Sequence, residues 1–182
     1  AVLAEGKTIL RNVAKEPEVE DLAKFLNSMG AKISGAGTDE IIINGVVDLN
    51  ESIFTIPADR IEAGTYLIAA AVTYGDITIK NINSNRMNNI LDKLKLSGAD
   101  IECDKDSIRL SMSQDSINSV DISTAPFPGF PTDMQAQFTV LNALSRGSAL
   151  ITENVFENRF MHVQELNRMG CDITVKGSNA FV

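Results

Sequence analysis

One carboxylate in this sequence stands where its position could matter for chemistry. Asp133 ends the stretch 124–133, which holds three of the five prolines of the chain. Proline fixes φ, so we expect a rigid loop whose last side chains are held in place. Thr132 or Asp133 could simply cap the helix that follows, and this is the simpler interpretation. Alternatively, a carboxylate on a rigid loop could act as general base toward a substrate hydroxyl. The two roles can coexist only if one carboxylate oxygen stays free.

An internal repeat indicates which elements position this loop. Three segments each begin at a glycine, continue into a short β-rich run, and end at a second glycine after a helical stretch. The opening glycines are Gly6, Gly75 and Gly147, and the closing ones are Gly30, Gly98 and Gly170. The repeat advances by roughly 70 residues, so we expect copies of one structural unit.

Each unit is predicted to be rich in βαβ structure and to contain two helices, which gives an α/β (α+β) fold class. The expected strands are Thr8 to Leu10, Ile77 to Ile79 and Ala149 to Ile151, with a further strand at Glu40 to Asn44. The expected helices cover 19–29, 61–72, 87–94 and 134–144. Asp59, in the run Pro57-Ala-Asp59, is expected to cap the helix that starts near Ile61.

The third unit departs from the repeat at two positions. Counted back from the closing glycine, Arg159 replaces Val19 and Met87, and His162 replaces Leu22 and Ile90. Either this helix is rotated or more exposed and Arg159 pairs with a nearby glutamate, or Arg159 projects into a cleft and binds a phosphate or carboxylate. For His162 we favour a hydrogen-bonded structural residue, since no acid or nucleophile partner is evident.

Composition excludes several classes of function. The 182 residues carry 16 Lys+Arg against 24 Asp+Glu, and a net charge of −8 disfavours nucleic acid as a partner. No apolar run is long enough for a membrane span, so we expect a cytoplasmic protein. Cys103, Cys171 and the single histidine offer too few ligands for a structural metal. Cys171 replaces Ala31 and Ala99, as a small buried residue would.

The ends of the chain fall inside repeat units. Residues 1–5 align with 70–74, the last turns of a helix, and the chain stops where the first unit is still in a strand. We therefore expect an internal piece of a longer protein. The segment 50–57 is the best candidate for a domain junction, which divides the chain into 1–56 and 57–182.

Several long motifs in order resemble the UDP-N-acetylglucosamine enolpyruvyl transferases. They are the runs at 16–22, 29–38, 59–65, 128–137 and 156–162. The resemblance implies an inside-out α/β barrel with two pseudo-threefold domains and an active site between them. Residues 1–56 would then be the last unit of one domain, and 57–182 would be two units of the other. This family transfers the enolpyruvyl group of phosphoenolpyruvate to the 3′-hydroxyl of UDP-N-acetylglucosamine in peptidoglycan synthesis, and no metal or organic cofactor is implied.

The resemblance also implies roles for particular residues. Asp133 corresponds to a carboxylate that contacts the sugar hydroxyl and is proposed as its base, and Arg159 to an arginine of the active-site cleft. Val155 corresponds to a position that contacts the UDP-sugar through its backbone. Asp59 matches an aspartate near the domain junction that could contact substrate. Asn154 stands where the family has threonine, which puts a contact of that hydroxyl in doubt.

Other parts of the family's active site lie outside this chain. They are a mobile loop with a reactive cysteine, an N-terminal Lys-Asn pair, and further arginines that hold phosphoenolpyruvate. We therefore expect that the isolated chain is inactive. Two alternatives remain: a piece of the related shikimate enzyme, and a non-catalytic folded scaffold or assembly module, in which exposed repeat interfaces form a homo-oligomer.

Overall fold

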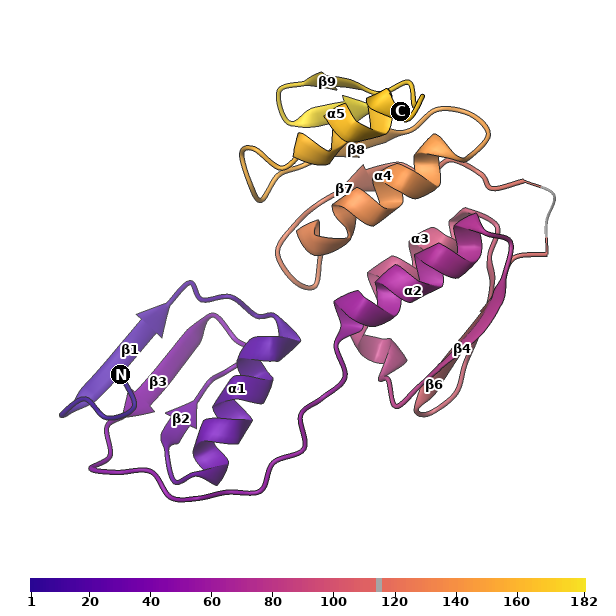
Figure 1. Ribbon diagram of the computed structural model, residues 1–182. Coiled ribbons are helices and arrows are strands. Elements are labelled where there is room, and N and C mark those ends of the chain that lie inside the picture. The colour runs from indigo at the N-terminus through magenta and orange to yellow at the C-terminus, as the bar shows by residue number, and fades with distance from the viewer. Residues whose placement is uncertain (114–115) are drawn as a thin grey trace. The chain divides into compact units, whose positions relative to one another are not determined.

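The computed structural model describes residues 1–113 and 116–182 and divides the chain into two compact units. The first unit comprises Ala1–Pro57 with Pro126–Pro128, and the second comprises Ala58–Ala125 with Gly129–Val182. The described strands form three separate open sheets, and no sheet closes into a barrel within these residues. Figure 1 shows the elements of both units.

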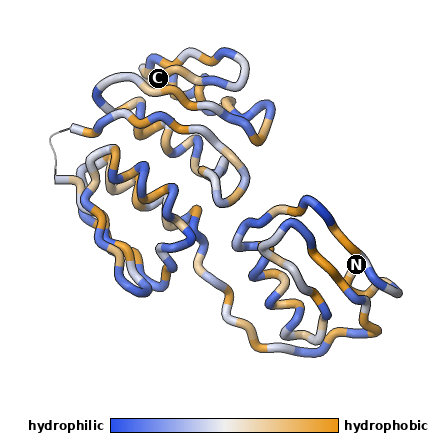
Figure 2. Tube along the Cα trace, turned by 180° about the vertical axis from the view of Figure 1, so that it is seen from behind, coloured by the Kyte–Doolittle hydropathy of each residue, from blue (hydrophilic) through white to orange (hydrophobic). Residues whose placement is uncertain are grey.

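The first unit is a three-stranded sheet with one helix. Its elements are β1 (Lys7–Arg11), α1 (Pro17–Ser28), β2 (Lys32–Ser34) and β3 (Glu40–Asn44), and the sheet order is β1-β3-β2. Both pairings are antiparallel, so β1 and β2 run parallel to each other with β3 between them. Ile41 and Ile43 are buried on one face of β3. Hydrophobic residues follow the strands of this sheet in Figure 2.

The second unit contains the same arrangement twice. One copy is β4 (Asp76–Lys80), α3 (Asn88–Leu96), β5 (Asp100–Cys103) and β6 (Ser107–Ser111), in the sheet order β4-β6-β5. The other is β8 (Leu150–Thr152), α5 (Met161–Arg168), β9 (Thr174–Lys176) and β10 (Asn179–Phe181), in the order β8-β10-β9. The short strand β7 (Ile122–Ser123) adds to β8 in parallel. Every repeat is therefore a β-α-β-β unit whose third strand lies in the middle.

Two further helices precede the first strand of these copies. They are α2 (Arg60–Val72), which leads into β4, and α4 (Gln135–Ala143), which leads into β8. Two short 3₁₀ turns complete the unit, η1 (Ser84–Arg86) before α3 and η2 (Thr132–Met134) before α4. The helix α2 packs against α3 and α4.

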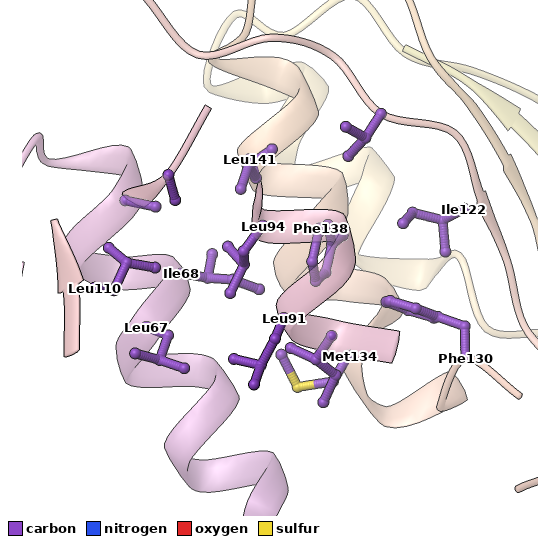
Figure 3. Close-up of a cluster of buried hydrophobic side chains, with 14 of the residues drawn as sticks. Leu67, Ile68, Leu91, Leu94, Leu110, Ile122, Phe130, Met134, Phe138 and Leu141 are labelled. Carbon is purple, nitrogen blue, oxygen red and sulfur yellow. The ribbon is translucent and has the colours of Figure 1, made fainter. Parts of the chain in front are cut away.

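The hydrophobic core of the second unit lies between these helices and the sheets (Figure 3). Leu67 on α2 and Phe138 and Leu141 on α4 are fully buried. The rings of Phe130 and Phe138 meet edge to face with centroids 5.1 Å apart, a favourable geometry for an aromatic pair. A Cβ added at Gly64 would lie 2.9 Å from Cε of Met134, so a larger residue there would require the end of the Met134 side chain to move.

Most of the predicted elements are present close to their predicted bounds. The three glycine-led strands and Glu40–Asn44 are strands, and the four predicted helices are α1, α2, α3 and α4. The prediction for 134–144 is wrong at its start, because a 3₁₀ turn occupies 132–134 and α4 begins at Gln135. Within 1–113 and 116–182, no helix has both the length and the apolar character needed to cross a bilayer.

Candidate functional site

The site predicted from the sequence gathers around the end of β8 and the turn η2. Asp133 lies in η2, and Arg159 lies in the turn before α5. Nη2 of Arg159 donates a hydrogen bond to Oδ1 of Asp133 at 2.6 Å. The other guanidinium nitrogen, Nη1, donates to Oγ1 of Thr132 at 3.1 Å. The guanidinium also lies 5.0 Å from the ring centroid of Phe156, a cation–π contact.

This arrangement corrects two parts of the first interpretation of Arg159, its helical position and its partner. The expected helical position is wrong, because α5 begins at Met161 and Arg159 precedes it. The expected pairing with a nearby glutamate is also wrong, since the carboxylate that it meets belongs to Asp133. The side chains of Arg159 and Asp133 are 35% and 53% exposed, so the pair can be reached from solvent. An arginine fork in such a place is suited to binding phosphate or carboxylate.

The prediction that Thr132 or Asp133 caps the following helix is wrong. The helix α4 begins after Met134 with no side-chain capping bond. Instead, the backbone N–H of Met134 donates to the carbonyl of Pro131 at 3.0 Å, so the 3₁₀ turn satisfies that donor itself. Asp133 is therefore released from capping. Its Oδ2 atom makes no hydrogen bond within the described part of the chain, which leaves one oxygen for a substrate proton.

Asp59 does cap its helix, as predicted. Its Oδ1 atom accepts hydrogen bonds from the backbone N–H groups of Ile61 at 2.7 Å and Glu62 at 3.1 Å. These bonds satisfy two donors at the start of α2. Among the described contacts, none joins Asp59 to Asp133 or Arg159. The structure thus brings Asp133 and Arg159 together, and places Asp59 at a helix start.

A buried carboxylate that the sequence analysis missed is hydrogen-bonded to Thr132, the residue that Arg159 also contacts. Glu153, the residue after β8, is 2% exposed. Its Oε1 atom accepts bonds from the Thr124 hydroxyl at 2.8 Å and from the backbone N–H groups of Val155 at 2.9 Å and Phe156 at 3.1 Å. Its Oε2 atom accepts a bond from the Thr132 hydroxyl at 2.8 Å. Burial alone would raise the pKa of Glu153, but these bonds to the charged form outweigh it and hold the pKa below the usual glutamate value.

The repeat contained a signal for this residue. Asn12 and Asn81 stand at the equivalent point of the first two units, six residues after the opening glycine, and both have a positive φ, of 54° and 61°. Asparagine tolerates this left-handed conformation better than most residues. Glu153 replaces the asparagine only in the third unit.

Val155 and Asn154 are tied to the same network. Val155 is 36% exposed, and its backbone N–H already donates a hydrogen bond to Oε1 of Glu153. Any backbone contact of Val155 with a ligand would therefore use its carbonyl. The Asn154 side chain donates from Nδ2 to Oγ of Ser123 at 2.9 Å and to the carbonyl of Thr124 at 3.0 Å. The asparagine at this position thus links the turn to the end of β7.

His162 lies apart from these polar contacts. Its side chain is partly buried, and Nε2 has no hydrogen-bond partner among the described residues, so the prediction of a hydrogen-bonded histidine is wrong for that nitrogen. Burial lowers the pKa of His162 below its usual value. The ring centroid lies 6.3 Å from that of Phe160. The residue belongs to the packing of α5.

An open pocket of about 370 Å³ adjoins Arg159. It is lined by the turn 157–161, one face of α5 and residues of the β9 hairpin.

Both cysteines are free, Cys103 exposed and Cys171 partly buried. In the described part of the chain, no three His, Cys, Asp or Glu side chains are grouped so that they could hold a metal ion.

Comparison with known proteins agrees with this fold. The family model described as EPSP synthase (3-phosphoshikimate 1-carboxyvinyltransferase) matches residues 1–181, and the chain belongs to this family. A solved structure of the enolpyruvyl transferase NikO from Streptomyces tendae superimposes with a TM-score of 0.86 at 25% identity, over 100% of this chain and 43% of that one. An EPSP synthase structure from Acinetobacter baumannii, at 17% identity and a TM-score of 0.52 over 100% of this chain and 42% of that one, supports the fold alone.

Curated relatives are more similar in sequence. The UDP-N-acetylglucosamine 1-carboxyvinyltransferase of Coxiella burnetii is 54% identical over 182 residues, which is 100% of this chain and 42% of the relative. The protein of the same name from Aeromonas hydrophila is 53% identical over 180 residues, 99% of this chain and 43% of the relative. The chain thus spans about two fifths of the length of these relatives.

Proposed function

We propose that this chain is part of an enolpyruvyl transferase that moves the enolpyruvyl group of phosphoenolpyruvate to the 3′-hydroxyl of UDP-N-acetylglucosamine, a step of peptidoglycan synthesis. The observation that carries the proposal is the Asp133–Arg159 pair on an uncapped turn, in a chain 54% identical to relatives of that name. The shikimate-type alternative is less well supported, because the EPSP synthase of Acinetobacter baumannii is only 17% identical to this chain.

In the proposed reaction, Asp133 accepts the proton of the sugar hydroxyl through its unengaged oxygen. The hydroxyl oxygen bonds to the enolpyruvyl carbon, the bond from that carbon to the phosphate oxygen breaks, and the departing inorganic phosphate takes up the proton from Asp133, which returns the carboxylate to its charged form. Arg159 lies 2.6 Å from the carboxylate and supplies positive charge toward anionic groups of the substrates. Val155 contributes its carbonyl to the UDP-sugar.

The test is an amide NMR titration of the chain with UDP-N-acetylglucosamine, with shikimate 3-phosphate as the control ligand. We expect saturable shifts around Asp133, Val155 and Arg159, and none with shikimate 3-phosphate. D133N and R159K should weaken binding by about tenfold, the loss of one charge-assisted hydrogen bond. The matched control is D76N, which breaks another close aspartate–arginine pair, Asp76 with Arg109 at 2.7 Å. A well-dispersed spectrum without shifts would refute a competent half-site.

Asp59 is proposed as a further substrate contact through the carboxylate oxygen that does not cap α2. D59N separates this role from capping, because asparagine caps about as well as aspartate but carries no charge. Weaker sugar binding in D59N at unchanged stability is expected. Equal binding would leave Asp59 with its structural role only.

We expect no turnover by this chain alone, since it spans about two fifths of its relatives. Steady phosphate release from the purified chain with both substrates would contradict this.

Because Cys103 and Cys171 are free, we also propose a reducing, cytoplasmic location.

An assembly module is the second candidate. Large apolar side chains of the first unit are exposed, among them Val47 at 98% and Ile53 at 102%. Apolar exposure of this kind favours self-association into a homo-oligomer. A mass that rises with protein concentration, together with no response to UDP-N-acetylglucosamine, would favour this candidate over the transferase fragment.

A further inference from the structure

We propose that Glu153 is a positioning residue, whose carboxylate holds Thr132 and the turn 154–156 and, through Thr132, fixes the guanidinium of Arg159 beside Asp133. The inference rests on the proposed function, because Asp133 and Arg159 meet substrate only in that proposal. Glu153 itself is 2% exposed and is therefore not available to the substrate.

The contacts of Glu153 account for its burial. An ionised carboxylate away from water is costly unless hydrogen bonds replace those of water. Four donors point at this one, two hydroxyls and two backbone N–H groups, at distances from 2.8 to 3.1 Å. They come from segments distant in sequence, residues 124 and 132 on one side and 155–156 on the other. One carboxylate thus joins the proline-rich loop to the turn that leads to Arg159.

The hydrogen bonds also have a fixed direction. The Arg159 guanidinium can only donate, so Oγ1 of Thr132 must accept at 3.1 Å. The single proton of that hydroxyl is then directed to Oε2 of Glu153 at 2.8 Å. The chain of hydrogen bonds therefore runs from Arg159 through Thr132 to Glu153. An amide at position 153 would face donors on all sides and could not accept from all four.

The repeat separates this role from a requirement of the fold. Asn12 and Asn81 occupy the equivalent point in two repeats that form the same β-α-β-β unit without a carboxylate there. Glu153 is found in the repeat that holds the Asp133–Arg159 pair. The carboxylate is thus needed where this pair is positioned, and not for the strand order.

The experiment follows the Arg159 guanidinium N–H signals in ¹⁵N NMR spectra of the full chain. The variants are E153Q, T132V and T132S, with E102Q as the control, an exposed glutamate changed in the same way. E153Q and T132V should each speed hydrogen exchange of the Arg159 guanidinium by about tenfold, the loss of one hydrogen bond to a charged group. T132S keeps the hydroxyl and should restore wild-type exchange, as should E102Q. The amide signals of Val155 and Phe156 should move in E153Q but not in T132V.

Wild-type Arg159 signals in folded E153Q would overturn the inference. Should E153Q fail to fold, wild-type signals in T132V would overturn it equally. Sugar binding gives a separate measurement: if the wild-type chain binds UDP-N-acetylglucosamine, E153Q and T132V should bind more weakly, and equal binding would again count against positioning. If the wild-type chain does not bind, the proposed half-site fails, whereas the guanidinium signals still decide the role of Glu153.

Discussion

The second and third repeats share a frame but use the same short motif differently. Both carry Pro-x-Asp before a helix, as Pro57-Ala-Asp59 and Pro131-Thr-Asp133. Asp59 caps α2 with bonds to Ile61 and Glu62. Asp133 caps nothing and pairs with Arg159. Two aspartates in matching sequence contexts thus have different tasks.

A single turn accounts for the difference. In the third repeat, η2 lies between the proline and α4. Within this turn the backbone N–H of Met134 donates to the carbonyl of Pro131, so it needs no side-chain cap. A capping aspartate has its oxygen occupied by backbone donors, whereas an aspartate inside the turn keeps its carboxylate for other partners. Local backbone geometry, more than residue type, therefore decides whether such an aspartate stabilises a helix or contributes to a site.

Cavities in α2 and α4 should cause the greatest loss of stability, and they test whether the two helices are packed equivalently. Leu67 follows Asp59 by the same number of residues as Leu141 follows Asp133, and both leucines are 0% exposed. Leu67→Ala and Leu141→Ala should each lower the free energy of unfolding by about 3 kcal/mol, as cavities in packed cores do. Urea denaturation monitored by circular dichroism measures this. Losses of unfolding free energy that differ severalfold would show that the two helices do not contribute equally to stability.

The next effect should appear only in the third repeat. Glu153→Gln should cost about 2 kcal/mol at neutral pH, because hydrogen bonds to a buried charge are lost. Since the folded-state pKa of Glu153 lies below the usual value of 4.5, its stabilisation is complete above that pH and disappears as the pH falls through the folded-state pKa. The difference between wild type and variant should therefore shrink in acid. Asn81→Gly, at the equivalent point of the second repeat, should show a difference that does not change with pH.

The two aspartates themselves should give a smaller and asymmetric result. Asp59→Ala should lower the free energy of unfolding by about 1 kcal/mol through loss of the cap. Asp133→Ala breaks an exposed ion pair and should cost no more than about 0.5 kcal/mol. Chemical denaturation of both variants measures the contrast. Equal losses would mean that Asp133 contributes to the helix in a way that its hydrogen bonds do not reveal.

The smallest effect concerns His162, which replaces Leu22 and Ile90 of the other repeats. Its folded-state pKa lies below the usual 6.5, so the unfolded chain binds a proton more readily. Stability should be complete above pH 6.5 and decline as the pH falls toward the folded-state pKa. Thermal unfolding at about pH 7.5 and about pH 5.5 should show this decline. His162→Leu should remove it, and a slope that persists in the variant would assign it to another group.

The sequence predicted the frame well because the frame is repeated. Opening glycines marked a strand in each of the three repeats, and apolar spacing marked four helices, two of which end at a closing glycine, so each prediction was supported by an equivalent element elsewhere in the chain. The start of α4 was missed because a 3₁₀ turn depends on backbone bonds that leave no distinctive residue pattern. The chain also places Arg159 ahead of α5, where the count from the closing glycine had suggested a helix.

The site was only partly predictable for a different reason. Asp133 and Arg159 were identified one by one, but their contact joins residues 26 apart in sequence. Glu153 was passed over because its role depends on donors from Thr124, Thr132 and the turn after β8, which only the folded chain brings together. The asparagines at the equivalent points of the other repeats were the one sequence signal that could have revealed it.

The strand order of the repeats also governs the sequence in which they can form during synthesis. In each β-α-β-β unit the central strand is the last to leave the ribosome, after both of its neighbours and the helix. Until β3, β6 or β10 emerges, the two earlier strands have no adjacent strand of their own repeat to bond. The three-stranded sheet of each repeat can therefore be completed only after its last strand has been synthesised, and until then the two earlier strands present unpaired edges to each other's side of the repeat.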